Sequence, residues 1–196
     1  MGMIAGSWAQ RTIADGEVTT VKLADGAVTP VKLSFNSFKH IQTVNLTAAS
    51  TTITLSDIPS SYEILYLFMS LKSNGSSQSN VRLRFDNDSS EAYRWVRIYS
   101  DGSTVSTDSM FSSLDTSINL GFINYTHFYL YDVTINNPDG YHKQTSSRFS
   151  EMSSPRIGLC GGNYIVGAKA TSIVIFIEDG SAFSAGSRAI LYGVGE

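Results

Sequence analysis

The 196-residue chain has a single cysteine, Cys160, and few charged residues. One cysteine allows no disulfide within the chain, so stability must come from burial and assembly. Charged residues make up only 16% of the sequence, the net charge is −3, and no basic block is present. The chain therefore lacks the positive patch expected of a nucleic-acid-binding protein. A lone cysteine beside two glycines is more often a packed hydrophobic residue than a nucleophile, and we expect Cys160 to be packed.

Long apolar runs are also missing. No window approaches the ~20 consecutive apolar residues of a transmembrane helix. The first ten residues have neither the basic start nor the apolar core of a secretory signal. We therefore expect no membrane insertion and synthesis in the cytoplasm of the producing cell.

Catalytic motifs are equally scarce. The sequence contains no Gly-x-Ser-x-Gly elbow, no phosphate-binding loop and no His-Glu-x-x-His pair. His40, His127 and His142 lie far apart in sequence. The last two fall on adjacent predicted strands and would be able to face each other, but without a third ligand they are more typical of polar surface residues than of a metal site. We expect no enzymatic activity, no metal and no cofactor.

Acidic residues offer weaker alternatives. Asp86, Asp88 and Glu91 crowd one turn, where their oxygens would suit calcium. This turn lacks the glycine and the length of an EF-hand, and a turn held by Asx hydrogen bonds is the competing interpretation. No pattern pairs Asp115 with Asp132, as glycoside hydrolysis would require. Asp132 interrupts an apolar strand, so we expect it to face a sheet edge or to enter a subunit contact.

A repeat dominates the N-terminal part of the chain. Residues 13–33 contain two ten-residue copies of the pattern Ala-Asp-Gly-x-Val-Thr-x-Val-Lys-Leu, each interpreted as a turn and one helical turn. Such a unit cannot bury its apolar residues alone. We expect residues 1–34 to form a stem that joins several chains and anchors them to a larger particle; the alternative is a periodic linker. The predicted anchoring and oligomerisation residues are Ile4, Trp8, Ile13, Val18, Val21, Leu23, Val28, Val31 and Leu33.

After a connector at 35–40 the apolar pattern changes to a period of two, which is typical of β-strands. Asn-Gly and Asp-Gly turns separate the runs. Residues 41–196 are therefore predicted to form an all-β domain, an antiparallel β-sandwich of jelly-roll type. The Ser-, Thr- and Asp-rich stretch 103–117 is expected to be the one long loop. Ten strands are predicted, near residues 41–47, 51–56, 62–72, 80–86, 91–99, 118–124, 127–136, 141–150, 171–178 and 187–193.

The predicted strand within 62–71 is apolar on both of its faces. A second sheet would cover one face. The other face also requires cover, and a neighbouring subunit is a natural candidate for it.

Aromatic and basic residues are densest at Tyr93, Arg94, Trp95 and Arg97. These residue types are favoured at recognition surfaces, so the four residues form a candidate surface-recognition cluster. The competing interpretation is that the aromatic residues belong to the core, as aromatic residues of β-strands usually do.

Three motifs carry a resemblance to a known group of proteins. The Asp-Gly-x-Val-Thr-x-x-Lys-Leu repeat resembles stem segments of tailed-bacteriophage virion proteins, such as tail fibres and head-decoration proteins. The stretch 85–90, Phe-Asp-Asn-Asp-Ser-Ser, followed by Tyr93, is similar to a Phe-Asn-Asn-Asp-Ser-Gly…Tyr stretch in such proteins. The ending 186–194, Gly-Ser-Arg-Ala-Ile-Leu-Tyr-Gly-Val, is similar to the final strand of many fibre and decoration domains.

This resemblance implies a non-enzymatic, usually trimeric structural protein of a phage virion. The leading expectation is a short trimeric fibre or knob, anchored through its N-terminus to other capsid or tail proteins, with a β-sandwich pointing outward for contact with a host glycan or protein. The alternative is a capsid decoration protein that stabilises the head. A virion-bound carbohydrate-processing enzyme is the remote third possibility.

Overall fold

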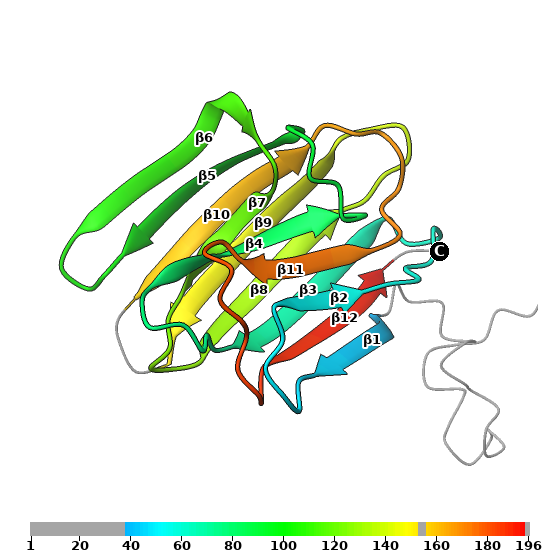
Figure 1. Cartoon of the computed structure of the whole chain (residues 1–196). Coiled ribbons are helices and arrows are strands. Elements are labelled where there is room, and N and C mark those ends of the chain that lie inside the picture. Colours follow the sequence, from blue (N-terminus) through cyan, green and yellow to red (C-terminus); the bar gives the residue numbers. More distant parts are fainter. Residues whose placement is uncertain (1–37, 153–155, 195–196) are drawn as a thin grey trace, which may run out of the picture. The chain divides into compact units, whose positions relative to one another are not determined.

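Apolar and polar residues alternate through most of the chain after residue 38, and this part folds almost entirely into β-strands (Figure 1). The structure, a computed structural model, describes residues 38–152 and 156–194, without the side chains of 111–113. The predicted stem 1–34 and all its candidate anchoring residues lie outside the described residues. The strands are β1 (Lys39–Asn45), β2 (Thr52–Leu55), β3 (Ile64–Leu71), β4 (Ser79–Phe85), β5 (Tyr93–Ser100), β6 (Val105–Asp115), β7 (Ile118–Ile123), β8 (Tyr129–Asn136), β9 (Lys143–Glu151), β10 (Ile157–Tyr164), β11 (Ile173–Ile177) and β12 (Arg188–Val194).

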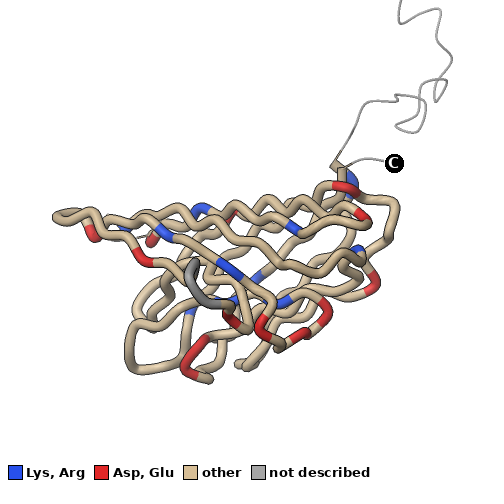
Figure 2. The backbone as a smooth tube through the Cα atoms, turned by 90° about the horizontal axis from the view of Figure 1, so that it is seen from above, with Lys and Arg blue, Asp and Glu red and all other residues tan. Residues whose placement is uncertain are grey.

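The strands form two antiparallel sheets. One has eight strands in the order β1-β12-β3-β8-β9-β10-β5-β6, and the other has four in the order β2-β11-β4-β7. Seen along the layers, the two sheets stack on each other (Figure 2). The all-β, antiparallel, two-sheet prediction is therefore confirmed. Across the described ranges, no helix is long and apolar enough to cross a membrane.

The core lies between the two sheets. Each strand contributes alternate residues to it, as the period of two predicts. Strand β3 buries Leu65, Leu67, Met69 and Leu71, while β8 buries alternate apolar residues beside it. The core therefore covers the inner face of the eight-stranded sheet, and the four-stranded sheet leaves its other face uncovered.

All ten predicted strands are present, but two further strands were missed. The stretch 103–117, predicted to be a loop, contains β6, which pairs with β5 alone at the edge of the large sheet. That prediction was wrong because Ser, Thr or Asp occupies seven of the eleven positions of β6. An edge strand needs little apolar surface, so its composition resembles that of a loop.

The second missed strand, β10, is rich in glycine for a packing reason. A Cβ at Gly158 would lie 2.3 Å from the ring of Phe149, and one at Gly162 would lie 2.7 Å from Ile118. The inner face of β10 therefore has no room for side chains at these two positions. Glycine is rare in strands, so the glycine-rich sequence of β10 does not resemble a strand, and the prediction missed it.

Candidate functional site

The side of the eight-stranded sheet turned away from the core, called here the outer face, gathers most of the exposed apolar side chains. Of the twelve large hydrophobic residues exposed in the described part of the chain, eight lie on this face. The most exposed of them is Val105 at 68%. The eight residues are Phe38, Phe68, Val96, Ile98, Val105, Leu130, Ile157 and Leu159.

Strand register aligns the outward side chains into rows that cross the whole sheet. The first row runs from β6 to β1 through Thr107, Ile98, Leu159, Arg148, Asp132, Phe68, Ile190 and Thr43. The second row contains Val105, Ser100, Ile157, Ser150, Leu130, Ser70, Arg188 and Asn45. The third row contains Ser109, Val96, Gly161, Ser146, Thr134, Tyr66, Tyr192 and His40.

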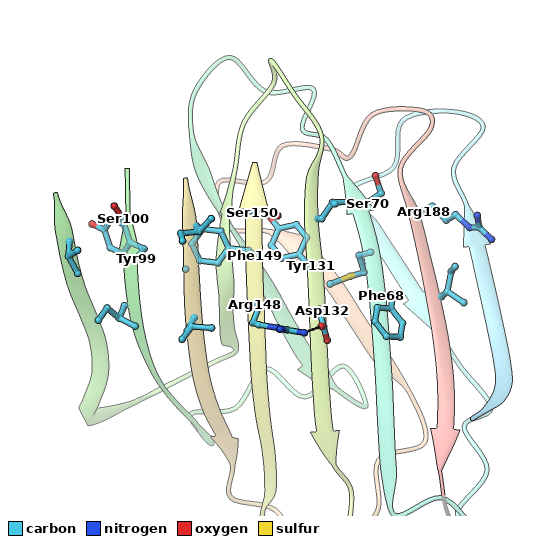
Figure 3. A pocket seen from close by; sticks show the side chains of 18 residues that line it. Phe68, Ser70, Tyr99, Ser100, Tyr131, Asp132, Arg148, Phe149, Ser150 and Arg188 are labelled. Atoms are coloured by element: carbon cyan, nitrogen blue, oxygen red, sulfur yellow. Dashed lines mark hydrogen bonds and ion pairs between the residues drawn. The ribbon is translucent and has the colours of Figure 1, made fainter. Parts of the chain in front are cut away.

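A broad hollow of about 870 Å³ lies over the first two rows. It extends from Ile190 on β12 to Val105 on β6, so it spans nearly the full width of the sheet. In Figure 3, Arg148 and Asp132 point toward each other near its middle and form an ion pair. Their side chains remain 70% and 32% exposed, so water screens the pair and its contribution to stability is small.

Aromatic rings extend the apolar surface beyond this hollow toward β1. The ring of Phe38 lies 4.6 Å from that of Tyr66 and 6.4 Å from that of Tyr192, and Tyr192 lies 6.1 Å from Phe68. A second hollow of about 370 Å³ is lined by Phe38, Phe68, Ile190 and Tyr192. Edge-to-face ring contacts of this kind hold the rings in fixed positions and keep the patch apolar.

Most of the outer face is apolar. Its polar groups include serines, threonines and the Arg148–Asp132 ion pair, and at the β1 edge the Nε2 atom of His40 lies 2.8 Å from the Thr43 hydroxyl. Within the described residues, no group of three or more His, Cys, Asp and Glu side chains converges as a metal site would require. The free energy that such a surface can supply comes from removing its apolar area from water.

No protein-family model matches the chain, and no curated protein matches its sequence.

The predicted surface-recognition cluster is wrong for three of its four residues. Tyr93, Trp95 and Arg97 point into the core and are 0%, 4% and 3% exposed. Only Arg94 points to the opposite, solvent side of β5. The alternation that defines a strand separates Arg94 from its neighbours, and two large aromatic residues on one face direct that face inward.

Arg97 is buried as part of a network of polar groups at the β5–β6 side of the sandwich. Its guanidinium donates to Asp108 at 3.0 Å and to Asn80 at 2.7 Å, and it lies 4.0 Å from the centre of the Phe122 ring. Arg82 donates to Asp115 at 3.0 Å and pairs with Glu178. Ion pairs and ring contacts therefore hold two arginines inside a protein with few charges.

The acidic turn contains an Asx hydrogen bond, as the competing interpretation predicts, because Asp88 Oδ1 accepts from the backbone N–H of Ser90 at 2.8 Å. Bonds to residues far away in sequence also hold the turn. One oxygen of Asp86 accepts from the backbone N–H groups of Thr171 and Ser172, both at 2.9 Å. Asp88 accepts from the hydroxyl of Tyr164 at 2.7 Å, and this bond holds the pKa of the Asp88 carboxyl below its usual range. Glu91 forms no part of these hydrogen bonds. Hydrogen bonds thus link this turn, which follows β4, to β10 and to the residues just before β11.

The expectation that His127 and His142 could face each other is wrong. Strands β8 and β9 pair from Tyr129 opposite Glu151 to Asn136 opposite Gln144. His127 therefore lies at one end of the hairpin and His142 at the other. His127 instead lies 3.3 Å from Glu151, whose buried carboxylate also accepts from the Tyr129 hydroxyl at 2.7 Å.

Asp132 does not face a sheet edge. Strand β8 lies in the middle of the eight-stranded sheet, and Asp132 points outward to pair with Arg148. The alternative, that Asp132 enters a subunit contact, stays a prediction. Asp115 lies at the end of β6 and is held by Arg82 and by the indole N–H of Trp95 at 2.8 Å.

Cys160 is packed in the core, as the sequence indicates. Burial raises the pKa of the Cys160 thiol to about 11, so the group remains a protonated thiol at pH 8. We expect a disulfide reagent to label the native protein at least roughly 100-fold more slowly than the denatured chain, because labelling must await opening of the core. The absorbance of the thiolate that the reagent releases on labelling measures this rate. Equal rates in native and denatured protein would contradict the packing.

Proposed function

We propose that this protein is a non-enzymatic structural component of a tailed-phage virion, and that its β-sandwich takes part in assembly and in contact with the host surface. The outer face carries this proposal. Soluble monomers rarely expose a contiguous apolar patch larger than a few hundred Å², and larger patches mark interaction sites. A broad apolar face fits a protein that acts by binding.

The stem supplies the second part of the proposal. Residues 1–34 would join three chains and anchor them to capsid or tail proteins, because their repeated apolar residues need neighbours. The sandwich would then form a short fibre or knob that contacts a host glycan or protein. The jelly-roll type of the sandwich belongs to the same proposal, and the many short antiparallel strands with glycine-rich turns support it.

A capsid decoration protein is the second candidate, and one feature favours it. The outer face is broad and crosses nearly the whole sheet, which suits a protein that lies against other proteins. A carbohydrate-processing enzyme has less support. Asp115 and Glu178 come together on Arg82, but ion pairs with a buried arginine hold both carboxylates.

The proposal is tested by the location of the protein. We expect the full chain to copurify with phage particles released from producing cells, and immunogold labelling to find it on the tail for a fibre or on the head for a decoration protein. The double variant Val21→Asp with Val31→Asp should fold yet stay in the soluble lysate, because its stem can no longer bury its apolar residues. The matched control is Tyr141→Asp, which alters an exposed residue of the sandwich. Particles without the full chain would overturn the proposal.

A further inference from the structure

The outer face has a midline. Eight strands place the boundary between β8 and β9 at the centre, with β1, β12 and β3 beyond β8 and β10, β5 and β6 beyond β9. A two-fold axis parallel to the strands and above this midline would lay the face of one copy on the face of another. Each side chain would then meet the residue of its own row that lies equally far from the midline on the opposite side.

The first row matches itself about this midline. Arg148 on β9 corresponds to Asp132 on β8, so opposite charges meet. One strand farther out, Leu159 corresponds to Phe68, and both are apolar. Beyond these two, Ile98 corresponds to Ile190, and at the edges Thr107 corresponds to Thr43. Charge, apolar character and polarity therefore agree at all four distances from the midline.

Within two strands of the midline, the second row matches by size. In the second row Leu130 corresponds to Ser150 and Ile157 corresponds to Ser70, so a large side chain meets a small one. Large residues opposite small ones interdigitate, as facing layers of a protein core do.

In the third row one pair follows this rule, since Tyr66 corresponds to Gly161, the one outward glycine of the three rows. Thr134 corresponds to Ser146, which are two small residues, and Tyr192 corresponds to Val96, which are two large ones. A Cβ at Gly161 would have only Val96 within 4 Å, so the surface is open above it. The tyrosine ring of a second copy would fill this space.

The apolar area is sufficient for a stable pair. Eight exposed apolar residues, each with about half of its surface accessible, present on the order of 700 Å², since such a residue offers on the order of 150–200 Å² when fully exposed. A standard interface buries about 800 Å² on each partner.

We propose that the outer face of the eight-stranded sheet is an isologous interface with a second copy of this chain, related by a two-fold axis along the β8–β9 midline. Arg148 then pairs with Asp132 of the partner subunit, and Phe68 packs on Leu159 of the partner subunit. The contact uses the sandwich alone. It therefore goes beyond the trimeric stem of the proposed function and is independent of it. When both contacts form, they link the sandwiches of two trimers.

The mass of the full chain in solution distinguishes the four possible results. Native mass spectrometry or sedimentation should give an even-numbered assembly. A hexamer supports both the stem and the face, and a dimer supports the face while contradicting the trimeric stem. A trimer or a monomer as the only species at micromolar concentration overturns the two-fold interface, whatever it says of the stem.

Charge exchange tests the axis itself. Asp132→Arg places two arginines at the midline of each copy, and Arg148→Asp places two aspartates there. We expect each variant alone to associate through the face at least tenfold more weakly than the unaltered chain, because like charges meet across the axis. An equimolar mixture of the two variants should associate again, since every arginine then meets an aspartate of the other variant.

Two results would overturn the axis: both variants pair as well as the unaltered chain, or their mixture fails to pair. Tyr141→Asp, at an exposed residue outside the three rows, should leave the assembly unchanged. The thermal unfolding midpoint of each variant at low concentration establishes that the sandwich is folded. Leu159→Asp gives an independent check, because it places a charge opposite Phe68 of the partner subunit and should also prevent pairing.

Discussion

Arg82→Met is expected to lower the free energy of unfolding by about 3 kcal/mol, because it leaves the largely buried carboxylate of Asp115 without its cation. The Arg82 guanidinium is nearly buried and serves two acidic side chains, Asp115 and Glu178. It also lies 5.1 Å from the centre of the Trp95 ring. Methionine fills a similar volume, so the loss measures the charge and its hydrogen bonds rather than a cavity.

Urea unfolding followed by tryptophan fluorescence measures this change. The control is Lys169→Met, which breaks an ion pair with Glu63, a residue whose side chain is largely in water. We expect that variant to change the free energy of unfolding by no more than about 1 kcal/mol. Adding Asp115→Asn to Arg82→Met should restore part of the stability, since it removes the stranded charge. A change below 1 kcal/mol for Arg82→Met would show that the network contributes little.

Gly121→Ala is expected to destabilise the fold by about 3 kcal/mol or more, because it combines a forbidden backbone angle with a steric clash. Gly121 has φ of +130°, and a Cβ there would lie 2.3 Å from the Phe149 ring. The ring has no room to retreat, since a Cβ at Gly158 on the neighbouring β10 would lie 2.3 Å from the same ring. Glycines of β7 and β10 thus enclose one phenylalanine.

Gly140→Ala measures the free-energy cost of a side chain at a positive φ where no steric clash is added. Its φ is +74° and no atom lies within 4 Å of the added Cβ, so we expect a loss of only about 1 kcal/mol. Thermal and urea unfolding of both variants give the difference. Combining Gly121→Ala with Phe149→Leu should cost less than the sum of the two single changes, because the smaller side chain relieves the clash. Additive losses would show that the backbone angle alone is responsible.

The local sequence pattern predicts most of the strands. It fails for β6 and β10, because residues of other strands or the position in the sheet determine the composition of these two strands. β10 has glycines because Phe149 and Ile118, from other strands, occupy the space beside it. β6 is polar because it lies at an edge, and edge position is a property of the whole sheet. Neither cause is visible within the sequence of the strand itself.

The sequence predicted only one part of the candidate site. The two-faced strand within 62–71 indicated an outer face that needs cover, and Phe68 lies on that face. Leu159 was hidden in the glycine-rich strand, and the link between Asp132 and Arg148 depends on the β8–β9 register. The cluster at Tyr93, Trp95 and Arg97 failed as a surface because an arginine in a strand is usually exposed, while Arg97 has Asp108 and Asn80 as buried partners.

Strand β6 has a consequence for how copies of the protein can accumulate. An eleven-residue edge strand offers a row of unpaired N–H and C=O groups that would template the addition of further strands and lead to fibrillar aggregates. Its seven Ser, Thr and Asp residues make such templating unfavourable, because a stacked copy would bury polar side chains. At the opposite edge, β1 carries Lys39 and a bulge between His40 and Gln42, which disrupts the same kind of growth. Both edges of the sheet therefore carry features that disfavour the lateral addition of further strands.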